Sequence, residues 1–206
     1  MNELILIRHG ESHYNAMLTD NLDSQLTDKG REQAKRTGKF LREHFGHIQD
    51  FVGLTSPYLR CLQTSEIIQQ ELGIEFLVTS GPREIMVSYD TTVKVPNRSV
   101  DFPHLEWASP IYSEPRIDDS WIFNQETADE FLKRIALFMH SGLPEKTLVV
   151  SHGTPVCSMY DIKLGMKKPP DLHTYVGNAS VTYIRDGEGI WFGKNIHAEK
   201  EKRENI

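Results

Sequence analysis

The chain has few cysteines and no long hydrophobic run. Its two cysteines, Cys61 and Cys157, each fall in a stretch that reads as a helix, so the sequence does not suggest a disulfide framework and suits a reducing compartment. No segment approaches the roughly 18 apolar residues that a membrane span requires, and the N-terminus lacks a signal-peptide layout. We therefore expect a cytoplasmic protein with no membrane partner.

The chain also has fewer positively charged than negatively charged residues. Lys and Arg number 23 against 29 Asp and Glu, which gives a net charge of −6. Nucleic acids and anionic membranes are bound by surfaces rich in Lys and Arg, so neither is an expected partner. A Gly-rich nucleotide loop is missing too. An anionic substrate would have to be attracted by a local cluster of cationic side chains.

The length of 206 residues fits one domain over residues 1–206. Residues from about 85 to 125 form an aperiodic insertion with scattered prolines and aromatics. This insertion could be a lid over a substrate or a segment packed on the sheet edge. Residues from about 194 to 206 are mostly charged, which predicts a solvated tail.

Strand and helix patterns alternate along the rest of the chain. Short apolar runs without alternation predict strands buried on both faces at residues 4–7, 51–54, 74–78 and 148–150, with later strands near 180–184 and 190–192. Helices are predicted after a Thr27 N-cap, after Pro57, at a Thr127–Glu130 capping box and after Pro155. The order predicts an α/β three-layer sandwich: a mostly parallel central sheet with helices on both faces, plus the inserted segment.

Polar residues follow each of the predicted buried strands. Ligands of open parallel sheets bind beyond the carboxyl ends of the strands, so these residues should meet at one mouth. They are Arg8, His9 and Gly10; Thr55, Ser56, Pro57 and Arg60; Arg83 and Glu84; Ser151, His152 and Gly153. Arg60 would lie in the first turn of a helix, where its guanidinium, free backbone N–H groups and the helix dipole favour an anion. Arg8 could hold a second edge of a phosphate through its fork of donors.

Four blocks of sequence resemble the histidine phosphatase, or phosphoglycerate mutase-like, superfamily. They are RHGESHYN at 8–15, LTDKGREQA at 26–34, TSPYLRCLQT at 55–64 and SHG at 151–153. The matching framework runs from residue 4 to about 84 and from about 126 to 184. The resemblance implies the same α/β fold and a reaction on a small phosphorylated substrate, with no cofactor and no metal.

The resemblance also implies roles for individual residues. His9 would attack phosphorus and become phosphohistidine, which requires a neutral imidazole; neighbouring arginines disfavour the imidazolium, and a backbone carbonyl could hold the proton of the other ring nitrogen. The phosphoryl oxygens would be surrounded by Arg8, Arg60, Asn15 and His152, with a further hydrogen bond from Ser12. Glu84 would protonate the departing substrate oxygen and then activate water.

Some assignments have competitors. The glycine and aromatic residues that often follow the family's glutamate are replaced by IMVSYD after Glu84, so Glu106 or Asp101 could serve as the acid instead. His9 and His13 are spaced like a zinc-binding pair, but the H-E-x-x-H pattern needs Glu where Gly10 stands.

The favoured activity is hydrolysis of a small phosphomonoester. Glycolytic mutases of the family carry an aromatic and Thr-Gly rich stretch after the first motif, and here that stretch is MLTDNLDSQ. A phosphoglycerate-type mutase is the alternative, and a non-catalytic binding member of the superfamily is a third possibility. The substrate itself and the oligomeric state do not follow from the sequence; Lys94, Arg98 and Arg116 could contact a second anionic group or be exposed loop charges.

Overall fold

The computed structural model describes residues 2–85, 106–107, 125–165 and 176–197. Its strands are β1 (Glu3–Arg8), β2 (Val52–Thr55), β3 (Phe76–Val78), β4 (Glu106–Trp107), β5 (Lys146–Ser151), β6 (Val181–Arg185) and β7 (Glu188–Lys194). Its helices are α1 (Asp28–His44), the short 3-10 turn η1 (Ile48–Asp50), α2 (Leu59–Leu72), α4 (Ala128–His140) and α5 (Gly153–Lys163).

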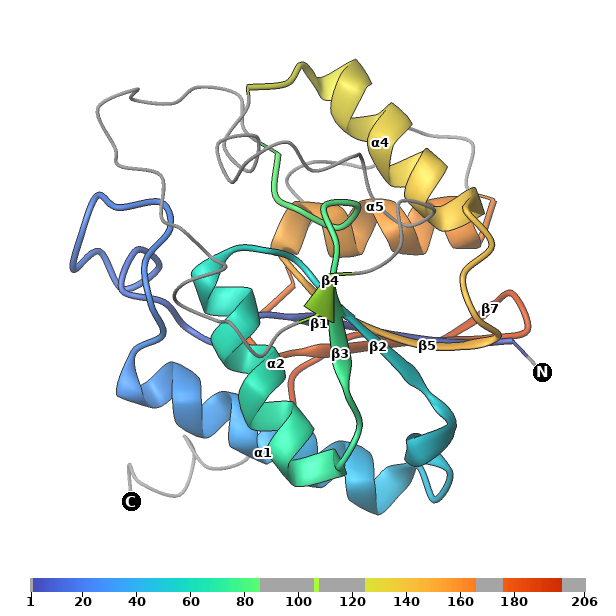
Figure 1. The fold of residues 1–206 in the computed structure, drawn as a ribbon, viewed down its shortest axis with the longest axis horizontal. Coiled ribbons are helices and arrows are strands. Elements are labelled where there is room, and N and C mark those ends of the chain that lie inside the picture. Colours follow the sequence, from blue (N-terminus) through green and yellow to red (C-terminus); the bar gives the residue numbers. More distant parts are fainter. Residues whose placement is uncertain (1, 86–105, 108–124, 166–175, 198–206) are drawn as a thin grey trace.

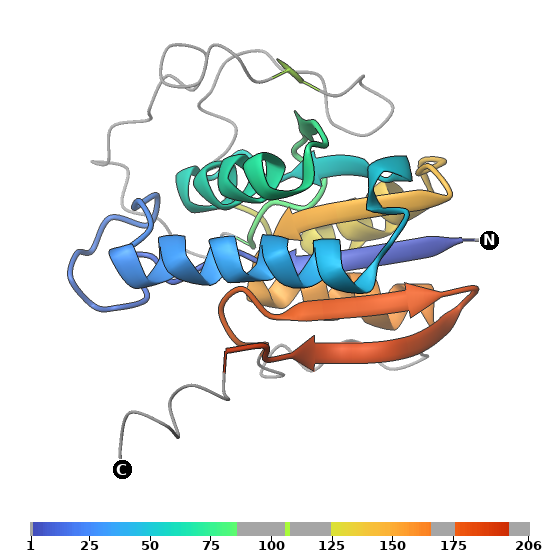
Figure 2. The same cartoon turned by 90° about the horizontal axis from the view of Figure 1, so that it is seen from below.

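The described strands form one sheet in the order β4-β3-β2-β5-β1-β6-β7. Strands β1 to β5 run parallel to one another, whereas β6 pairs antiparallel with β1 and β7 antiparallel with β6. Helices α1 and α2 cover one face and α4 and α5 the other (Figure 1), and the β6–β7 hairpin lies at the edge (Figure 2). The predicted three-layer sandwich with a mostly parallel sheet is confirmed.

Strand β1 shows why its apolar run does not alternate with polar residues. Successive side chains of a strand point to opposite faces. Ile5 and Ile7 join the core beneath α1 and α2, while Leu4 and Leu6 join the core beneath α4 and α5. Because both faces of the strand are covered by helices, every one of these positions must be apolar.

Two of the predicted helix starts are confirmed by their caps. The Thr27 hydroxyl accepts a hydrogen bond from the Gly30 amide at 3.0 Å, and Thr127 and Glu130 form a complete capping box at α4. Helix α5 begins at Gly153, so Pro155 lies in its first turn, where a missing amide hydrogen does no harm. The prediction of a helix that starts after Pro155 is therefore three residues late.

The predicted strand ends also move by a few residues. The apolar run at 74–78 forms a strand only over Phe76–Val78, because Gly73 ends α2 in the left-handed conformation (φ 70°) and the chain must turn first. Strand β7 extends to Lys194, whose ammonium lies 4.2 Å from the centre of the Trp191 ring. Residue 194, where the charged tail is expected to start, is thus the last residue of a strand.

Little of the predicted insertion at 85–125 lies within the described residues. Its one strand there, β4, pairs parallel with β3 at the sheet edge. Asp101, Lys94, Arg98 and Arg116 lie outside the described residues, as does the side chain of Glu106. Within the described part of the chain, no helix is long and apolar enough to cross a bilayer.

Candidate active site

Two histidines meet where neighbouring strands end. Strands β1 and β5 pair in register with Arg8 opposite Ser151, so His9 and His152 leave the same edge of the sheet side by side. Their ring centres are 5.2 Å apart, with the planes at 67°. Both rings are buried, with 2% and 0% of their surface exposed. The predicted convergence of these two residues is therefore present in the structure.

Arg60 joins the two imidazoles. From the first turn of α2, its Nε donates to Nε2 of His9 at 3.0 Å and its Nη2 donates to Nδ1 of His152 at 3.0 Å. Its Nη1 donates to the carbonyl of Leu22. The side chain is 7% exposed. One planar guanidinium thus aligns both rings, a geometry that the ammonium of lysine cannot reproduce.

The contacts of His9 define its tautomer. Nδ1 lies 2.7 Å from the carbonyl oxygen of Gly10, which can only accept a hydrogen bond. Nε2 accepts a hydrogen bond from Nε of Arg60. The hydrogen is therefore on Nδ1, and the lone pair is on Nε2. Burial, followed by the positive charges of Arg60 and Arg8, holds the pKa of His9 well below its usual 6.5. The ring is neutral at physiological pH, as a nucleophile must be.

His152 has the opposite tautomer by the same reasoning. Its Nδ1 accepts from Arg60, so Nε2 carries the hydrogen and donates to Oγ of Ser56 at 2.8 Å. Burial and the charge of Arg60 lower its pKa as well. The thiol of Cys61 lies 3.4 Å from the same Nε2, and burial raises the pKa of this thiol to about 12, so the sulfur remains protonated.

Arg8 reaches the cluster from β1. Its Nη1 donates to the carbonyl of Val176 at 2.6 Å. A Cβ added to Gly153, the first residue of α5, would lie 3.7 Å from Nε of Arg8. The guanidinium is therefore next to the amino end of a helix, where the helix dipole also favours an anion. Arg8 and Arg60 together place two positive charges beside two neutral rings.

Glu84 lies at the rim of the cluster. Its Oε2 is 4.0 Å from Nδ1 of His152, and 25% of its side chain is exposed. Burial raises the pKa of this carboxyl above 4.5 despite the opposing effects of Arg60, of the Ile85 amide and of Arg8. A carboxyl group with a raised pKa beside a buried imidazole is suited to giving and taking a proton. The structure thus brings Glu84 to the place that the sequence predicts.

Ser12 and Asn15 lie in the loop after β1 and bind each other. The Ser12 hydroxyl donates to Oδ1 of Asn15 at 3.1 Å. Asn178 donates from Nδ2 to the same oxygen at 3.1 Å and to the His9 carbonyl at 3.3 Å. Because Oδ1 of Asn15 is occupied, its amide hydrogens are the groups left for an anion. Ser12 orients Asn15 in this arrangement, and its expected hydrogen bond to phosphate stays a prediction.

Asn178 is a residue whose part in the site the sequence did not reveal. The late segment that contains it reads as a lead into a strand, and only the tertiary structure brings it against His9. The amide of Ala179 also donates to the His9 carbonyl, at 3.1 Å. No local signal in the sequence marks these contacts.

Two neighbouring groups have partners that the sequence does not show. The first amide of α2 is not free for an anion, because Leu59 donates to Oδ1 of the buried Asp23 at 2.8 Å. This amide is therefore not available to an anion, whereas the Arg60 side chain reaches the two imidazoles. Arg83, which follows β3, points to Glu126 with its Nη2 3.5 Å from the carboxylate.

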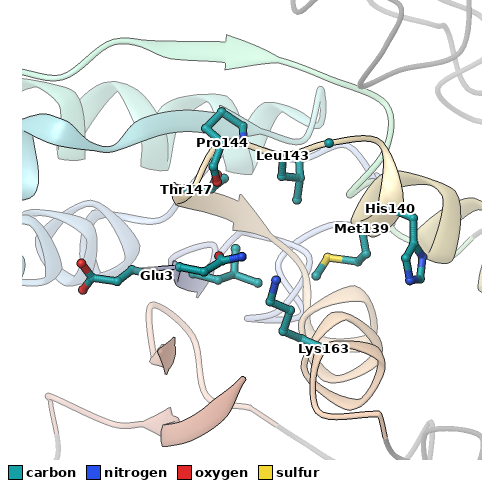
Figure 3. A pocket seen from close by; sticks show the side chains of 10 residues that line it. Glu3, Met139, His140, Leu143, Pro144, Thr147 and Lys163 are labelled. Carbon is teal, nitrogen blue, oxygen red and sulfur yellow. The ribbon is translucent and has the colours of Figure 1, made fainter. Parts of the chain in front are cut away.

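A separate hollow of about 200 Å³ lies at the opposite end of the sheet. It is lined by Asn2, Glu3 and Leu4 at the start of β1, by Thr147 near the start of β5, and by the ends of α4 and α5. In Figure 3 the Lys163 side chain extends toward the hollow, whereas the Glu3 carboxylate points away from it. The histidine cluster follows the other ends of these strands, so the two places are distinct.

Metal ligation has no obvious site in the parts of the chain that the structure describes. They contain no group of three or more His, Cys, Asp or Glu side chains placed to hold a metal ion. The two guanidinium groups beside the neutral imidazoles carry the positive charge and the N–H donors that bind phosphoryl oxygens in proteins.

The chain belongs to the histidine phosphatase superfamily, branch 1, whose family model matches residues 4–196. Among curated relatives, a probable phosphoglycerate mutase GpmB of Escherichia coli O1:K1 is 26% identical over 198 residues, covering 93% of this chain and 88% of that protein. The corresponding protein of Salmonella paratyphi A is 28% identical over 201 residues, with the same coverage. The resemblance found in the sequence motifs is confirmed.

Solved structures show the same fold at low sequence identity. A mycobacterial glucosyl-3-phosphoglycerate phosphatase superposes with a TM-score of 0.65 at 17% identity, over 95% of this chain and 100% of that one. A phosphoserine phosphatase of Entamoeba histolytica in complex with 3-phosphoglyceric acid gives 0.64 at 21%, over 96% and 99%. The ecdysone phosphate phosphatase of Bombix mori, in complex with tungstate, gives 0.66 at 16%, over 95% and 94%.

Proposed function

We propose that this protein is a phosphatase that hydrolyses a small phosphomonoester through a phosphohistidine intermediate on His9. One observation carries the proposal: Nε2 of His9 is an unprotonated nitrogen held by Arg60 beside a second neutral imidazole. A ring fixed in this tautomer is ready to form a bond to phosphorus. The phosphatases among the solved relatives are consistent with this reaction.

The first step transfers the phosphoryl group to the enzyme. The lone pair on Nε2 of His9 forms a bond to phosphorus while the bond from phosphorus to the substrate oxygen breaks, and that oxygen keeps the electron pair. Glu84 in its acid form gives the leaving oxygen a proton. Arg60 releases Nε2 in this step and turns its donors to the phosphoryl oxygens, together with Arg8 and the amide of Asn15. His152, whose hydrogen is on Nε2 and is donated to Ser56, takes part by orienting Arg60.

The second step frees the enzyme. Water attacks phosphorus as the Glu84 carboxylate takes one of its protons, the P–N bond breaks, and its electrons return to Nε2 of His9. Inorganic phosphate leaves, and Glu84 is again in its acid form. Each proton and electron pair is thus accounted for by His9, Glu84, substrate and water.

A panel of phosphomonoesters tests the proposal. Wild-type protein should release inorganic phosphate from at least one of them, and His9→Ala should abolish the release because the nucleophile is gone. His13→Ala is the matched control, since its ring takes no part in the contacts around Arg60. Equal phosphate release by wild type and His9→Ala would contradict the proposal.

A phosphoglycerate mutase activity is the second candidate. It is favoured by the names of the curated relatives, which match 93% of this chain. Interconversion of 2- and 3-phosphoglycerate without net phosphate release would establish it in place of hydrolysis. A binding member of the superfamily without catalysis would show neither activity. The two buried free thiols, Cys61 and Cys157, lead us to place the protein in the reducing cytoplasm.

A further inference from the structure

A buried ion pair between Arg134 and Glu126 contacts the backbone just before Glu84. Arg134 of α4 donates hydrogen bonds from Nε and Nη2 to the two carboxylate oxygens of Glu126, and the bond from Nε is 3.0 Å long. The side chains of both residues are only 6% exposed. Burying two charges is unfavourable unless further hydrogen bonds are made, so the remaining contacts of the pair indicate what it does.

The remaining donor of Arg134 binds the backbone that leads to Glu84. Its Nη1 donates to the carbonyl of Gly81 at 2.6 Å and to that of Arg83 at 3.2 Å. Arg83 is the residue immediately before Glu84. Two carbonyls separated by one residue are thereby fixed to a single guanidinium, so the direction in which the chain enters Glu84 depends on Arg134.

The same turn is fixed from two other sides. The carbonyl of Pro82 accepts a hydrogen bond from the Ser151 hydroxyl at 2.6 Å, and Ser151 directly precedes His152. Gly81 is packed so closely on α4 that an added Cβ would lie 2.2 Å from the ring of Phe138. Three successive carbonyls therefore tie the turn to α4 and to β5.

Glu126 gives the pair a second connection. Its Oε2 lies 3.5 Å from Nη2 of Arg83, and it stands just before the N-cap of α4 at Thr127. Arg134 thus links the turn before Glu84 to the start of α4 through one carboxylate. Glu126 compensates the charge of Arg134 at close range, and among the effects that lower the pKa of Glu84 that of Arg134 comes after those of Arg60 and Arg8. The contacts of Arg134 with the turn are therefore its main connection to Glu84.

From these contacts we propose that Arg134, held by Glu126, is a positioning residue that sets the Glu84 carboxyl for proton transfer to the leaving oxygen. The inference rests on the proposed function, because it assumes that Glu84 is the acid of that reaction. Proton transfer demands accurate geometry, and a displacement of about 1 Å can lower a rate by about 100-fold. A loosened turn would therefore affect the chemistry while His9 and Arg60 stay in place.

Leaving-group dependence tests this assignment. An alkoxide leaving group needs a proton from the enzyme, whereas 2,4-dinitrophenolate leaves without one. Because kcat/KM reports only the steps up to phosphorylation of His9, we expect Arg134→Met to lower kcat/KM for β-glycerophosphate by about 10- to 100-fold and kcat/KM for 2,4-dinitrophenyl phosphate by less than about threefold. Glu84→Gln should give the same pattern, and Arg134→Lys should recover part of the loss. Arg36→Met, which removes a partly exposed arginine of α1, is the control.

Two outcomes would overturn the inference. One is an equal loss on both substrates by an Arg134→Met protein that keeps the circular dichroism spectrum of the wild type; the other is no loss on either. If Arg134→Met does not fold, Glu126→Gln applies the same test, since it weakens the hold on Arg134 and keeps the arginine. A wild type that forms no phosphohistidine would refute the proposed function, whereas normal phosphohistidine with no leaving-group effect in Arg134→Met refutes only the positioning role.

Discussion

Replacement of Arg60 by methionine tests the central contact of the site in depth. The change keeps most of the side-chain length and removes hydrogen bonds to both imidazoles, each 3.0 Å long. It also removes the second-largest cause of the lowered pKa of His9 and of His152, after burial. Both pKa values should therefore rise toward 6.5.

The effect on activity follows from the same contacts. A hydrogen bond to a charged group contributes roughly 1.5–3 kcal/mol, so the loss of two such donors to the phosphoryl oxygens should lower kcat/KM by about 100-fold or more, at about 1.4 kcal/mol for each factor of ten. Because imidazolium cannot attack phosphorus, the acid limb of the pH profile should also move to higher pH. Arg60→Lys should restore part of the pKa effect but not the alignment of the two rings.

Proton NMR of the histidine ring protons, followed through a pH titration, measures the shift directly. His13 and His140 provide internal references, because neither is part of the cluster. If the pKa of His9 stayed the same or fell in Arg60→Met, the account of why this ring is neutral would be wrong. An unchanged kcat/KM would show that Arg60 does not contact the phosphoryl group.

Three further predictions concern charge, caps and packing. Activity needs neutral His9 and the acid form of Glu84, so the pH profile should extend below 6.5 and decline above the raised pKa of Glu84; Glu84→Gln should lower kcat and abolish that decline. Thr127→Ala breaks the capping box and should cost about 1 kcal/mol of unfolding free energy in urea. Gly10→Ala would put a Cβ 2.4 Å from the Gly30 carbonyl and should destabilise the protein by roughly 1–3 kcal/mol; unchanged urea midpoints would contradict both.

Much of the fold follows from local signals in the sequence. The apolar run of β1 requires cover on both faces, and the caps at Thr27 and Thr127 mark helix starts within a residue. The strand ends are less exact, because a position such as Ile74 is buried without joining the sheet. The antiparallel direction of β6 depends on its pairing with β1, which no local pattern encodes.

The cluster itself was predictable for a topological reason. Parallel strands end at one edge, so residues that follow separate strands must meet there, as His9 and His152 do. Contacts that depend on side-chain direction were not predictable. Asp23 occupies the amide of Leu59, and Arg83 turns to Glu126, because tertiary neighbours offer these groups a partner that the sequence order does not show.

Formation of a phosphorylated His9 is the most direct test of the proposed reaction. Wild type should be mixed with a substrate identified in the phosphomonoester panel, quenched in alkali within milliseconds to seconds, and analysed by mass spectrometry of its peptides. We predict an acid-labile, alkali-stable adduct of one phosphoryl group on His9 that disappears as phosphate is released. Steady turnover with an unmodified His9, or with the phosphoryl group on another residue, would contradict the central claim.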